Sequence, residues 1–179
     1  MTSFSMIDPT KGGDFQSAWE SSERAFLRGW HDDARGGRKA VLAVVAGPET
    51  HGAASADRLM REYELREQLN GAWAARPLAL LHEGGHTILI LEDHGGEPLD
   101  RLLGSPLEAR DFLRLAVGLS GAIGMMHDRR IIHKDIKPAN VFVNRATRQV
   151  WLTGFGIASR LLRERQMPDQ PELIAGTLA

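Results

Sequence analysis

Residues 131–144, IIHKDIKPANVFVN, restrict the fold more than any other stretch of this sequence. Apolar residues stand at both ends of the stretch, while charged and amide side chains interrupt it in the middle. Pro138 is expected to stop any helix and to prevent a regular central strand. We therefore predict a loop that is held at both ends by buried apolar residues. The interrupting polar side chains are His133, Lys134, Asp135, Lys137 and Asn140.

Composition limits the class of protein and of partner. The chain has 179 residues, a formal net charge of −1 and no cysteine. A near-neutral chain gives no electrostatic reason to expect a nucleic-acid or membrane partner, and without thiols neither disulfides nor thiolate metal sites can form. The N-terminus lacks an apolar stretch of signal-peptide length, and the longest apolar runs are too short to span a bilayer. We expect a soluble, cytoplasmic protein.

The patterns of apolar residues predict strands, one helix, more strands, and then a second helix. Residues 24–30 and 39–46 read as a hairpin, and residues 77–93 read as another around Gly84 and Gly85. Residues 54–69 have helical spacing, with Ser55 or Asp57 as a cap near the start. Residues 141–143 and 150–153 are expected to be two short strands joined by 145–148.

Residues 108–128 are the strongest helix of the sequence. Three glycines, Gly118, Gly121 and Gly124, would let another element approach this helix closely, at a cost in helix propensity. One apolar stripe is expected to face the core, and its members are Phe112, Leu115, Leu119, Ala122, Ile123 and Met126.

The predicted fold class is α+β, with a small antiparallel β lobe that carries one helix, followed by a mainly helical part. Gly95, Gly96 and Pro98 interrupt the pattern in residues 91–100 and place the junction there. The expected divisions are a flexible N-terminal arm over 1–20, a small lobe over 21–94 and a partial large lobe over 95–179.

The polar residues of the loop suit phosphoryl transfer, since a carboxylate, an ammonium and an amide lie within 135–140. Asp135 can accept a hydroxyl proton, Lys137 can neutralise charge on a transferred phosphate, and the Asn140 oxygen can ligate a metal ion. A charged surface turn between two strands is the alternative interpretation.

The loop HKDIKPAN resembles the catalytic loop of the protein kinase superfamily, His-Arg-Asp followed by four residues and Asn, with Lys134 in place of Arg. Lys137 and Pro138 resemble the serine/threonine type. The resemblance implies ATP and Mg²⁺ as cofactors, Asp135 and Lys137 as catalytic residues, and Asn140 as the metal ligand. The stretch LILEDHGGEPLDRLL resembles the segment between kinase lobes, which implies Leu91 as gatekeeper and the backbone of Glu92, Asp93 and His94 as adenine contacts.

Further stretches extend the resemblance over nearly the whole chain after residue 20. Glu62 matches the ion-pairing glutamate of the small-lobe helix, GFGIAS resembles the metal-binding Asp-Phe-Gly stretch, and AGTLA resembles the end of the activation segment with Thr177. The chain is most similar in character to the N-terminal kinase-like domain of large bacterial proteins that also carry an ATPase module and a sensor histidine kinase.

Four departures weaken the implied site. Gly154 replaces the aspartate of Asp-Phe-Gly, and Val44 replaces the strand lysine, for which Lys39 is a poor substitute. SAWESSER stands where a glycine-rich loop is expected, and the chain ends at Ala179 before the later helices, which should leave part of the face of 111–126 uncovered. Glu62 would then lack a partner and be a solvated helix residue. Losing one charge-stabilising donor typically costs ~2.7–4 kcal/mol.

Two functions therefore compete. The first is an ATP-binding serine/threonine kinase-like signalling module, and the alternative is a pseudokinase interaction or sensor domain with little phosphotransfer. Its partners would be a nucleotide and a protein substrate or downstream modules. A fragment of a longer chain without an independent stable state is a third interpretation.

Other motifs carry less weight. HEGGH, residues 82–86, matches a zinc motif that requires a helix, but Gly84 and Gly85 favour a turn. His127 and His133 are expected to be structural. Ser159 and Thr177 are weak candidates for phosphorylation.

Overall fold

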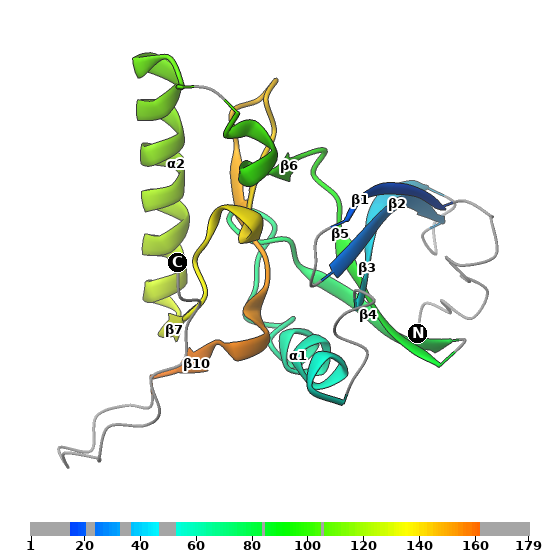
Figure 1. Cartoon of the computed structure of the whole chain (residues 1–179). Coiled ribbons are helices and arrows are strands. Elements are labelled where there is room, and N and C mark those ends of the chain that lie inside the picture. Colours follow the sequence, from blue (N-terminus) through cyan, green and yellow to red (C-terminus); the bar gives the residue numbers. More distant parts are fainter. Residues whose placement is uncertain are drawn as a thin grey trace, which may run out of the picture. The chain divides into compact units, whose positions relative to one another are not determined.

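The computed structural model describes residues 15–20, 24–32, 37–46, 53–83, 85–104 and 106–161. Within it the chain divides into two compact units, shown with the element labels in Figure 1. Unit 1 comprises the part up to Gly71 together with Ala75–Gly95, and unit 2 comprises Ala72–Ala74 together with the part from Gly96 onward. The α+β class is confirmed, because unit 1 is an antiparallel sheet with one helix and unit 2 is built around a long helix.

Unit 1 is a five-stranded sheet in the order β1-β2-β3-β5-β4, in which every neighbouring pair is antiparallel. Both predicted hairpins are confirmed, with Trp30 opposite Ala40 in the first and Glu83 opposite His86 in the second. The strands are β1 Phe15–Glu20, β2 Arg24–Asp32, β3 Arg38–Ala46, β4 Pro77–Glu83 and β5 His86–Glu92.

Strand β1 corrects the prediction of a flexible arm over residues 1–20, of which residues 1–14 lie outside the described residues. Phe15 and Trp19 are buried, and the Trp19 ring stacks on Phe26 of β2 at 5.2 Å between ring centroids. A register shift between Ser17 and Trp19 interrupts the alternation along the strand, so no regular two-residue period marks it in the sequence. Burial of the two aromatic rings gives the strand its hydrophobic anchor.

The central strands β3 and β5 are apolar on both faces. Val41, Ala43 and Val45 belong to one buried cluster with Ile88 and Ile90. On the opposite face the buried side chains are those of Leu42, Val44, Leu89 and Leu91. Burial on both faces explains why this sequence reads as continuous apolar runs rather than as an alternating pattern.

Helix α1, Ala53–Glu64, ends five residues before the predicted limit of 69. After the helix the chain forms turns, in which, for example, Gln68 N–H donates to the Leu65 carbonyl at 2.8 Å. Ser55 and Asp57 lie inside the helix, so the prediction that one of them is the cap was wrong. Leu59 is buried, and α1 contacts β4 and β5, which places it against the sheet as Figure 1 shows.

The main element of unit 2 is helix α2, Ala109–Asp128, close to the predicted range. No helix of the described residues is long and apolar enough to cross a membrane. The other elements are β6 Glu97–Pro98, β7 Ile131–Ile132, β8 Val141–Val143, β9 Val150–Leu152, β10 Ser159–Arg160 and the 3₁₀ helices η2 Leu99–Leu102, η3 Pro138–Asn140 and η4 Phe155–Ile157.

The predicted pair of short strands around residues 145–148 is confirmed, since β8 pairs with β9 in antiparallel fashion. The side chain of Asn144 shapes the connection by accepting hydrogen bonds from Ala146 N–H at 2.9 Å and Thr147 N–H at 3.1 Å. Strand β6 pairs with the other edge of β8, and β10 pairs with β7. These ladders hold both ends of residues 133–140.

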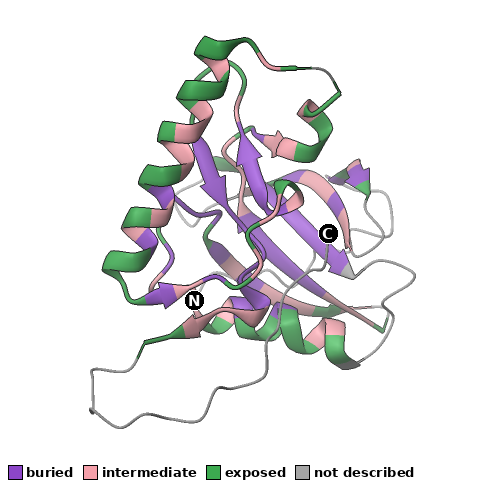
Figure 2. Ribbon diagram, turned by 60° about the vertical axis from the view of Figure 1, so that its left-hand side comes forward, coloured by how far each residue is buried: buried purple, intermediate pink, exposed green. Residues whose placement is uncertain are grey.

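The buried face of α2 differs in part from the predicted stripe. Ala122 and Met126 are buried, whereas Phe112, Leu113 and Val117 are 57%, 60% and 73% exposed. Figure 2 shows exposed and half-buried residues alternating along this helix. Within the described part of the chain, the exposure agrees with the expectation that part of the face of residues 111–126 lacks a cover, although Phe112 was predicted to face the core.

Candidate functional site

The loop after β7 is fixed by a buried histidine. His133 is 1% exposed, and its ring joins the Thr153 carbonyl through Nε2 at 2.9 Å. Its Nδ1 accepts the backbone N–H of Asp135 at 3.2 Å, which sets the ring tautomer as protonated at Nε2. His133 is therefore structural, as predicted, and it ties the loop to the segment after β9.

Pro138 does not exclude all helical structure, because it begins the three-residue 3₁₀ helix η3. Proline is tolerated at this first position, where its missing N–H has no helical partner to lose. The turn brings Asn140 N–H within 2.8 Å of the Lys137 carbonyl. This tight turn carries Asn140 back toward Asp135.

The structure brings the three predicted loop residues together. Lys137 Nζ lies 3.3 Å from Asp135 Oδ2, and Asn140 Nδ2 donates to Asp135 Oδ2 at 3.0 Å and to the Asp135 carbonyl at 2.8 Å. Asn140 is 4% exposed, and the side chains of Asp135 and Lys137 are 12% and 21% exposed. The result is a compact cluster of carboxylate, ammonium and amide in which the cation and the amide both face Asp135.

Gly154 lies directly against this cluster. Its φ is +83°, a left-handed conformation that favours glycine, and a Cβ added there would lie 2.5 Å from Asn140 Oδ1. The neighbouring Thr153 N–H donates to the Asn140 carbonyl at 3.0 Å. The Asn140 amide therefore occupies the space that a side chain at position 154 would need.

These residues do not fit a resident magnesium ion. Mg²⁺ takes an octahedral set of oxygen ligands, usually with one or two carboxylates. Here Gly154 offers no ligand, and Asp135 already faces an ammonium and an amide N–H. Among the described residues no three acidic or histidine side chains gather as a metal group.

The core beneath the loop is aromatic. Phe155 is fully buried, and its ring centroid lies 4.5 Å from that of His133 and 5.9 Å from that of Trp73. The Trp73 carbonyl accepts the N–H of Leu152 at 2.8 Å. Gly154 is therefore held between a strand and a buried ring, so its backbone cannot shift freely.

Residues 91–94, predicted to contact adenine through their backbone, belong to unit 1. Leu91 is buried at the end of β5, and the N–H groups of Glu92 and Asp93 donate to the carbonyls of Arg76 at 2.9 Å and Ala40 at 3.2 Å. Asp93 Oδ1 accepts the N–H of Gly95 at 2.8 Å. The segment is therefore well fixed, but neither of these two N–H groups remains as a donor for a ligand.

An arginine that sequence reasoning missed contacts this segment. Arg28 of β2 forms a two-pronged ion pair with the Asp93 carboxylate, with Arg28 Nη2 lying 3.3 Å from Oδ1 and Nε bonded to Oδ2. Asp93 is 5% exposed on its side chain, so its charge needs this partner. No local pattern links residues that are 65 positions apart in the sequence.

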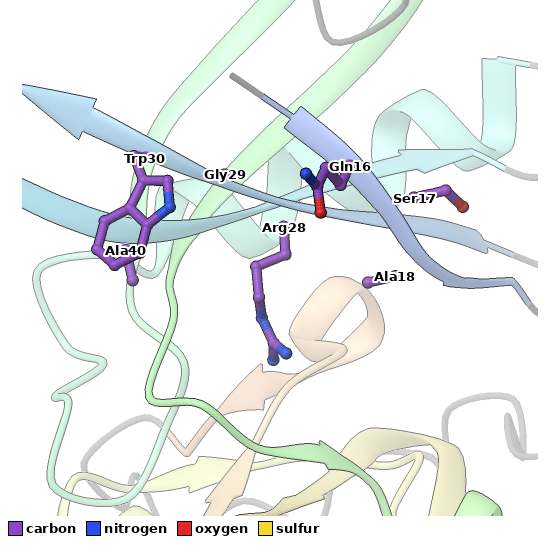
Figure 3. Close-up of a pocket in the computed structure, with 7 residues that line it drawn as sticks. All are labelled: Gln16, Ser17, Ala18, Arg28, Gly29, Trp30 and Ala40. Carbon is purple, nitrogen blue, oxygen red and sulfur yellow. The ribbon is translucent and has the colours of Figure 1, made fainter. Parts of the chain in front are cut away.

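Arg28 also lines a pocket of unit 1 with a volume of about 470 Å³. Figure 3 shows the Arg28 side chain extending away from the strands, with the Trp30 ring and Ala40 to one side. The volume is in the range of small-molecule sites, which is about 300–1,000 Å³. The lining residues come from β1, β2 and β3 and are Gln16, Ser17, Ala18, Arg28, Gly29, Trp30 and Ala40.

His94 is the last residue of the segment 91–94. Burial lowers the pKa of His94 below its usual value, and the carboxylates of Glu92 and Asp93 oppose that effect in part. Its Nε2 lies 3.8 Å from Glu92 Oε2. The net effect favours the neutral form of the imidazole over the charged form.

Glu62 is not the solvated helix residue that was expected. It is 1% exposed on α1, and Arg24 Nη1 lies 4.0 Å from its Oε2. Val44, which stands where the sequence analysis expected a strand lysine, is itself buried. No pattern in the sequence singles out Arg24.

The remaining candidates are placed as follows. His82 and His86 lie on the adjacent strands β4 and β5, so the helix that a zinc motif requires does not form there. Ser159 is half-buried in β10, His127 is exposed near the end of α2, and Thr177 lies outside the described residues.

Comparison with known proteins connects this geometry to a family. The sequence model of the protein kinase domain matches residues 37–177. The chain is 34% identical over 125 residues to serine/threonine-protein kinase pkn2 of Myxococcus xanthus, covering 68% of this chain and 15% of that protein. It is 28% identical over 131 residues to the MAP kinase kinase skh1/pek1 of Schizosaccharomyces pombe, covering 69% and 35%.

A third relative is the probable serine/threonine-protein kinase zyg-1 of Caenorhabditis briggsae, 26% identical over 157 residues, or 85% of this chain and 21% of that protein. The chain thus spans between 15% and 35% of the length of these curated relatives.

Proposed function

Because this chain belongs to the protein kinase domain family, we propose that it is a serine/threonine kinase-like, nucleotide-binding signalling domain in which phosphotransfer is slow or absent. The contact between Asn140 and Gly154 carries the proposal, because it closes the place where a metal-ligating side chain would stand. The loop keeps its carboxylate, ammonium and amide groups, while the positive charge that phosphoryl transfer needs is reduced.

The retained residues have defined roles in this proposal. Asp135 would orient a substrate hydroxyl and accept its proton, and Lys137, 3.3 Å away, would neutralise charge on the transferred group. Asn140 holds Asp135 through two hydrogen bonds to its carbonyl and carboxylate. These contacts support a positioned general base, not a metal cage.

The missing charges decide the expected rate. Magnesium, when bound to a kinase, neutralises the nucleotide phosphates. Loss of one charge-stabilising donor typically costs about 2.7–4 kcal/mol, a factor of about 10²–10³ in rate. Gly154 and Val44 each replace such a group, so a turnover far below that of an efficient kinase is expected.

Unit 1 would supply the nucleotide contacts. The fixed backbone of residues 91–94 and the nearby pocket lined by Arg28 and Trp30 support this assignment. ATP is the expected nucleotide, and a protein substrate or downstream signalling modules in the cytoplasm are the expected partners. An interaction or sensor role needs binding without rapid turnover.

Titration of ATP by calorimetry, with magnesium and with a chelator, tests the proposal. We expect ATP to bind with an affinity that magnesium barely changes, because Asp135 and Asn140 are engaged with each other. Absence of ATP binding in both conditions would contradict the nucleotide-binding function. A strong gain of affinity with magnesium would contradict the closed metal site.

Phosphate incorporation from labelled ATP separates the proposal from an active kinase. We expect the wild type and Asp135→Asn to be equally inactive within detection. Asp128→Asn, which changes an exposed carboxylate on α2, is the matched control. Incorporation that Asp135→Asn abolishes and Asp128→Asn preserves would establish an active serine/threonine kinase instead.

A further inference from the structure

The guanidinium of Arg28 is held in place by two contacts. It forms the two-pronged ion pair with the Asp93 carboxylate, and its Cζ lies 5.4 Å from the centroid of the Trp19 ring, which is a cation–π distance. The side chain of Arg28 is 41% exposed, whereas that of Asp93 is 5% exposed. A long side chain fixed in this way loses little further conformational freedom when a ligand packs on it. Arg28 is therefore a preorganised wall of the pocket that it lines.

A second planar group lines the same pocket from the same strand. Trp30 is 51% exposed, and the guanidinium of Arg38 lies 5.9 Å from the centroid of its ring. Residues two apart on a strand point to the same face of the sheet. Figure 3 shows the Trp30 ring beside the Arg28 side chain. The pocket thus has a guanidinium and an indole as neighbouring walls.

The spacing of these two groups fits one flat ring. Carbon atoms in contact lie about 3.5–4.0 Å apart, so a ring with a planar group on each face needs about 7–8 Å between those groups. Side chains two residues apart begin about 6.6–6.8 Å apart at the strand. They have only to diverge slightly to admit the ring, and the pocket volume of about 470 Å³ suits a small molecule.

Four polar groups of the pocket and of the adjoining segment 91–94 are poorly placed to distinguish one purine from another. The N–H groups of Glu92 and Asp93 donate to backbone carbonyls at 2.9 and 3.2 Å. The Asp93 carboxylate is engaged with Arg28 and with the N–H of Gly95. The amide of Gln16 is exposed on β1, where water competes for its hydrogen bonds. These groups therefore contribute little to reading the edge of a base.

We infer that Arg28 and Trp30 hold a purine ring between guanidinium and indole, so that the site accepts adenine and guanine nucleotides about equally. The inference rests on the proposed nucleotide-binding function. Adenine and guanine differ in the donors and acceptors along their edges, whereas stacking uses the ring face that both share. The positive charge of Arg28 adds a cation–π attraction to that face.

Acrylamide quenching of tryptophan fluorescence tests the contact with the base. Trp30 is 51% exposed, whereas Trp19, Trp73 and Trp151 are 8%, 0% and 4% exposed, so the quencher reports mainly on Trp30. ADP and GDP should each reduce the quenching, because a stacked base shields the indole. Ribose 5-phosphate, which has no base, should leave the quenching unchanged. Equal shielding by ribose 5-phosphate, or none by bound ADP, would overturn the stacking.

Calorimetric titration with ADP and GDP in a metal-free buffer tests the specificity. The two affinities of the wild type should differ by less than about 5-fold, the smallest discrimination that one edge-reading pair gives. Arg28→Lys keeps a cation beside Asp93 but removes the planar group, and it should weaken both nucleotides about 10-fold. Trp30→Leu should have a similar effect. Arg61→Lys, the same change at an exposed arginine of α1, should bind both like the wild type.

The outcomes separate this inference from the function on which it rests. If the wild type binds ADP at least about 10-fold more tightly than GDP, the base tolerance is overturned and the proposed function stands. If either Arg28→Lys or Trp30→Leu binds both nucleotides like the wild type, the stacking between these two residues is overturned. If the wild type binds neither ADP, GDP nor ATP, both fail together.

A merely structural role of Arg28 is distinguished by the thermal midpoint. Such a role would lower the midpoint of Arg28→Lys without changing the affinity of the folded protein for ADP and GDP, and that result would overturn the inference. Trp30→Leu changes a residue that is half exposed, so it keeps the test decisive if Arg28→Lys does not fold.

Discussion

Gly154 and Asn140 compete for one volume, so position 154 should be unusually sensitive to substitution. Gly154→Ala adds a methyl group 2.5 Å from Asn140 Oδ1 and forces a side-chain residue to adopt φ +83°. We expect a loss of about 1–3 kcal/mol in the free energy of unfolding, measured with urea. Gly154→Asp meets the same obstacle, so returning a carboxylate there requires Asn140 to rotate away from Asp135.

Gly85 is a matched control for this effect. Its φ is +79°, almost the same, but nothing lies within 4 Å of a Cβ added there. Gly85→Ala therefore carries only the backbone strain, and the difference between the two variants measures the contact with Asn140. Equal losses at the two positions would show that Asn140 yields without cost.

His94 should make unit 1 sensitive to acid. Its pKa is lowered by burial in the folded chain, so the unfolded chain binds the proton more readily, and stability contributed by neutral His94 is lost as the pH falls below 6.5, the unfolded value. Glu92 and Asp93 limit the size of this loss.

We expect His94→Gln to lose less stability than the wild type when urea unfolding is compared at about pH 7.5 and about pH 5.5. His127→Gln, an exposed change on α2, should retain the wild-type dependence. An unchanged pH dependence in His94→Gln would contradict this role of burial.

At the scale of the element, the glycines of α2 are not equivalent. A Cβ at Gly118 would lie 2.9 Å from Val150 Cγ2, whereas nothing lies within 4 Å of a Cβ at Gly121 or Gly124. The expected close approach of another element therefore holds for Gly118 alone of the three. Gly121→Ala should raise stability by up to about 1 kcal/mol through helix propensity, seen as a higher thermal midpoint. Gly118→Ala should gain less or lose stability, and an equal gain at both positions would contradict the contact with β9.

The sequence predicted elements well where periodicity was long or turns were marked. Helix α2 and both hairpins of unit 1 have the expected ranges, because glycine-marked turns and a sustained helical repeat are local signals. Strand β1 was missed because a register shift breaks its alternation. The early end of α1 was missed because helical spacing continues through residues 65–69, which the chain folds as turns.

At the scale of the whole molecule, the local contacts of the candidate site could be predicted from the sequence, whereas the long-range contacts could not. Asp135, Lys137 and Asn140 lie within one short loop, so their gathering could be predicted from sequence. The ion pairs of Arg24 and Arg28 join residues far apart in the chain, and only the tertiary fold of unit 1 brings them together. Long-range pairing of this kind leaves no periodic trace in a single sequence.

The uncovered part of α2 has a practical consequence. Phe112, Leu113 and Val117 form an exposed apolar patch on α2. Hydration of such a patch is unfavourable, and two copies of the purified chain reduce the exposed apolar area by packing their patches together. Light scattering from a concentrated sample should therefore rise faster than in proportion to concentration, and mild detergent should reverse the rise.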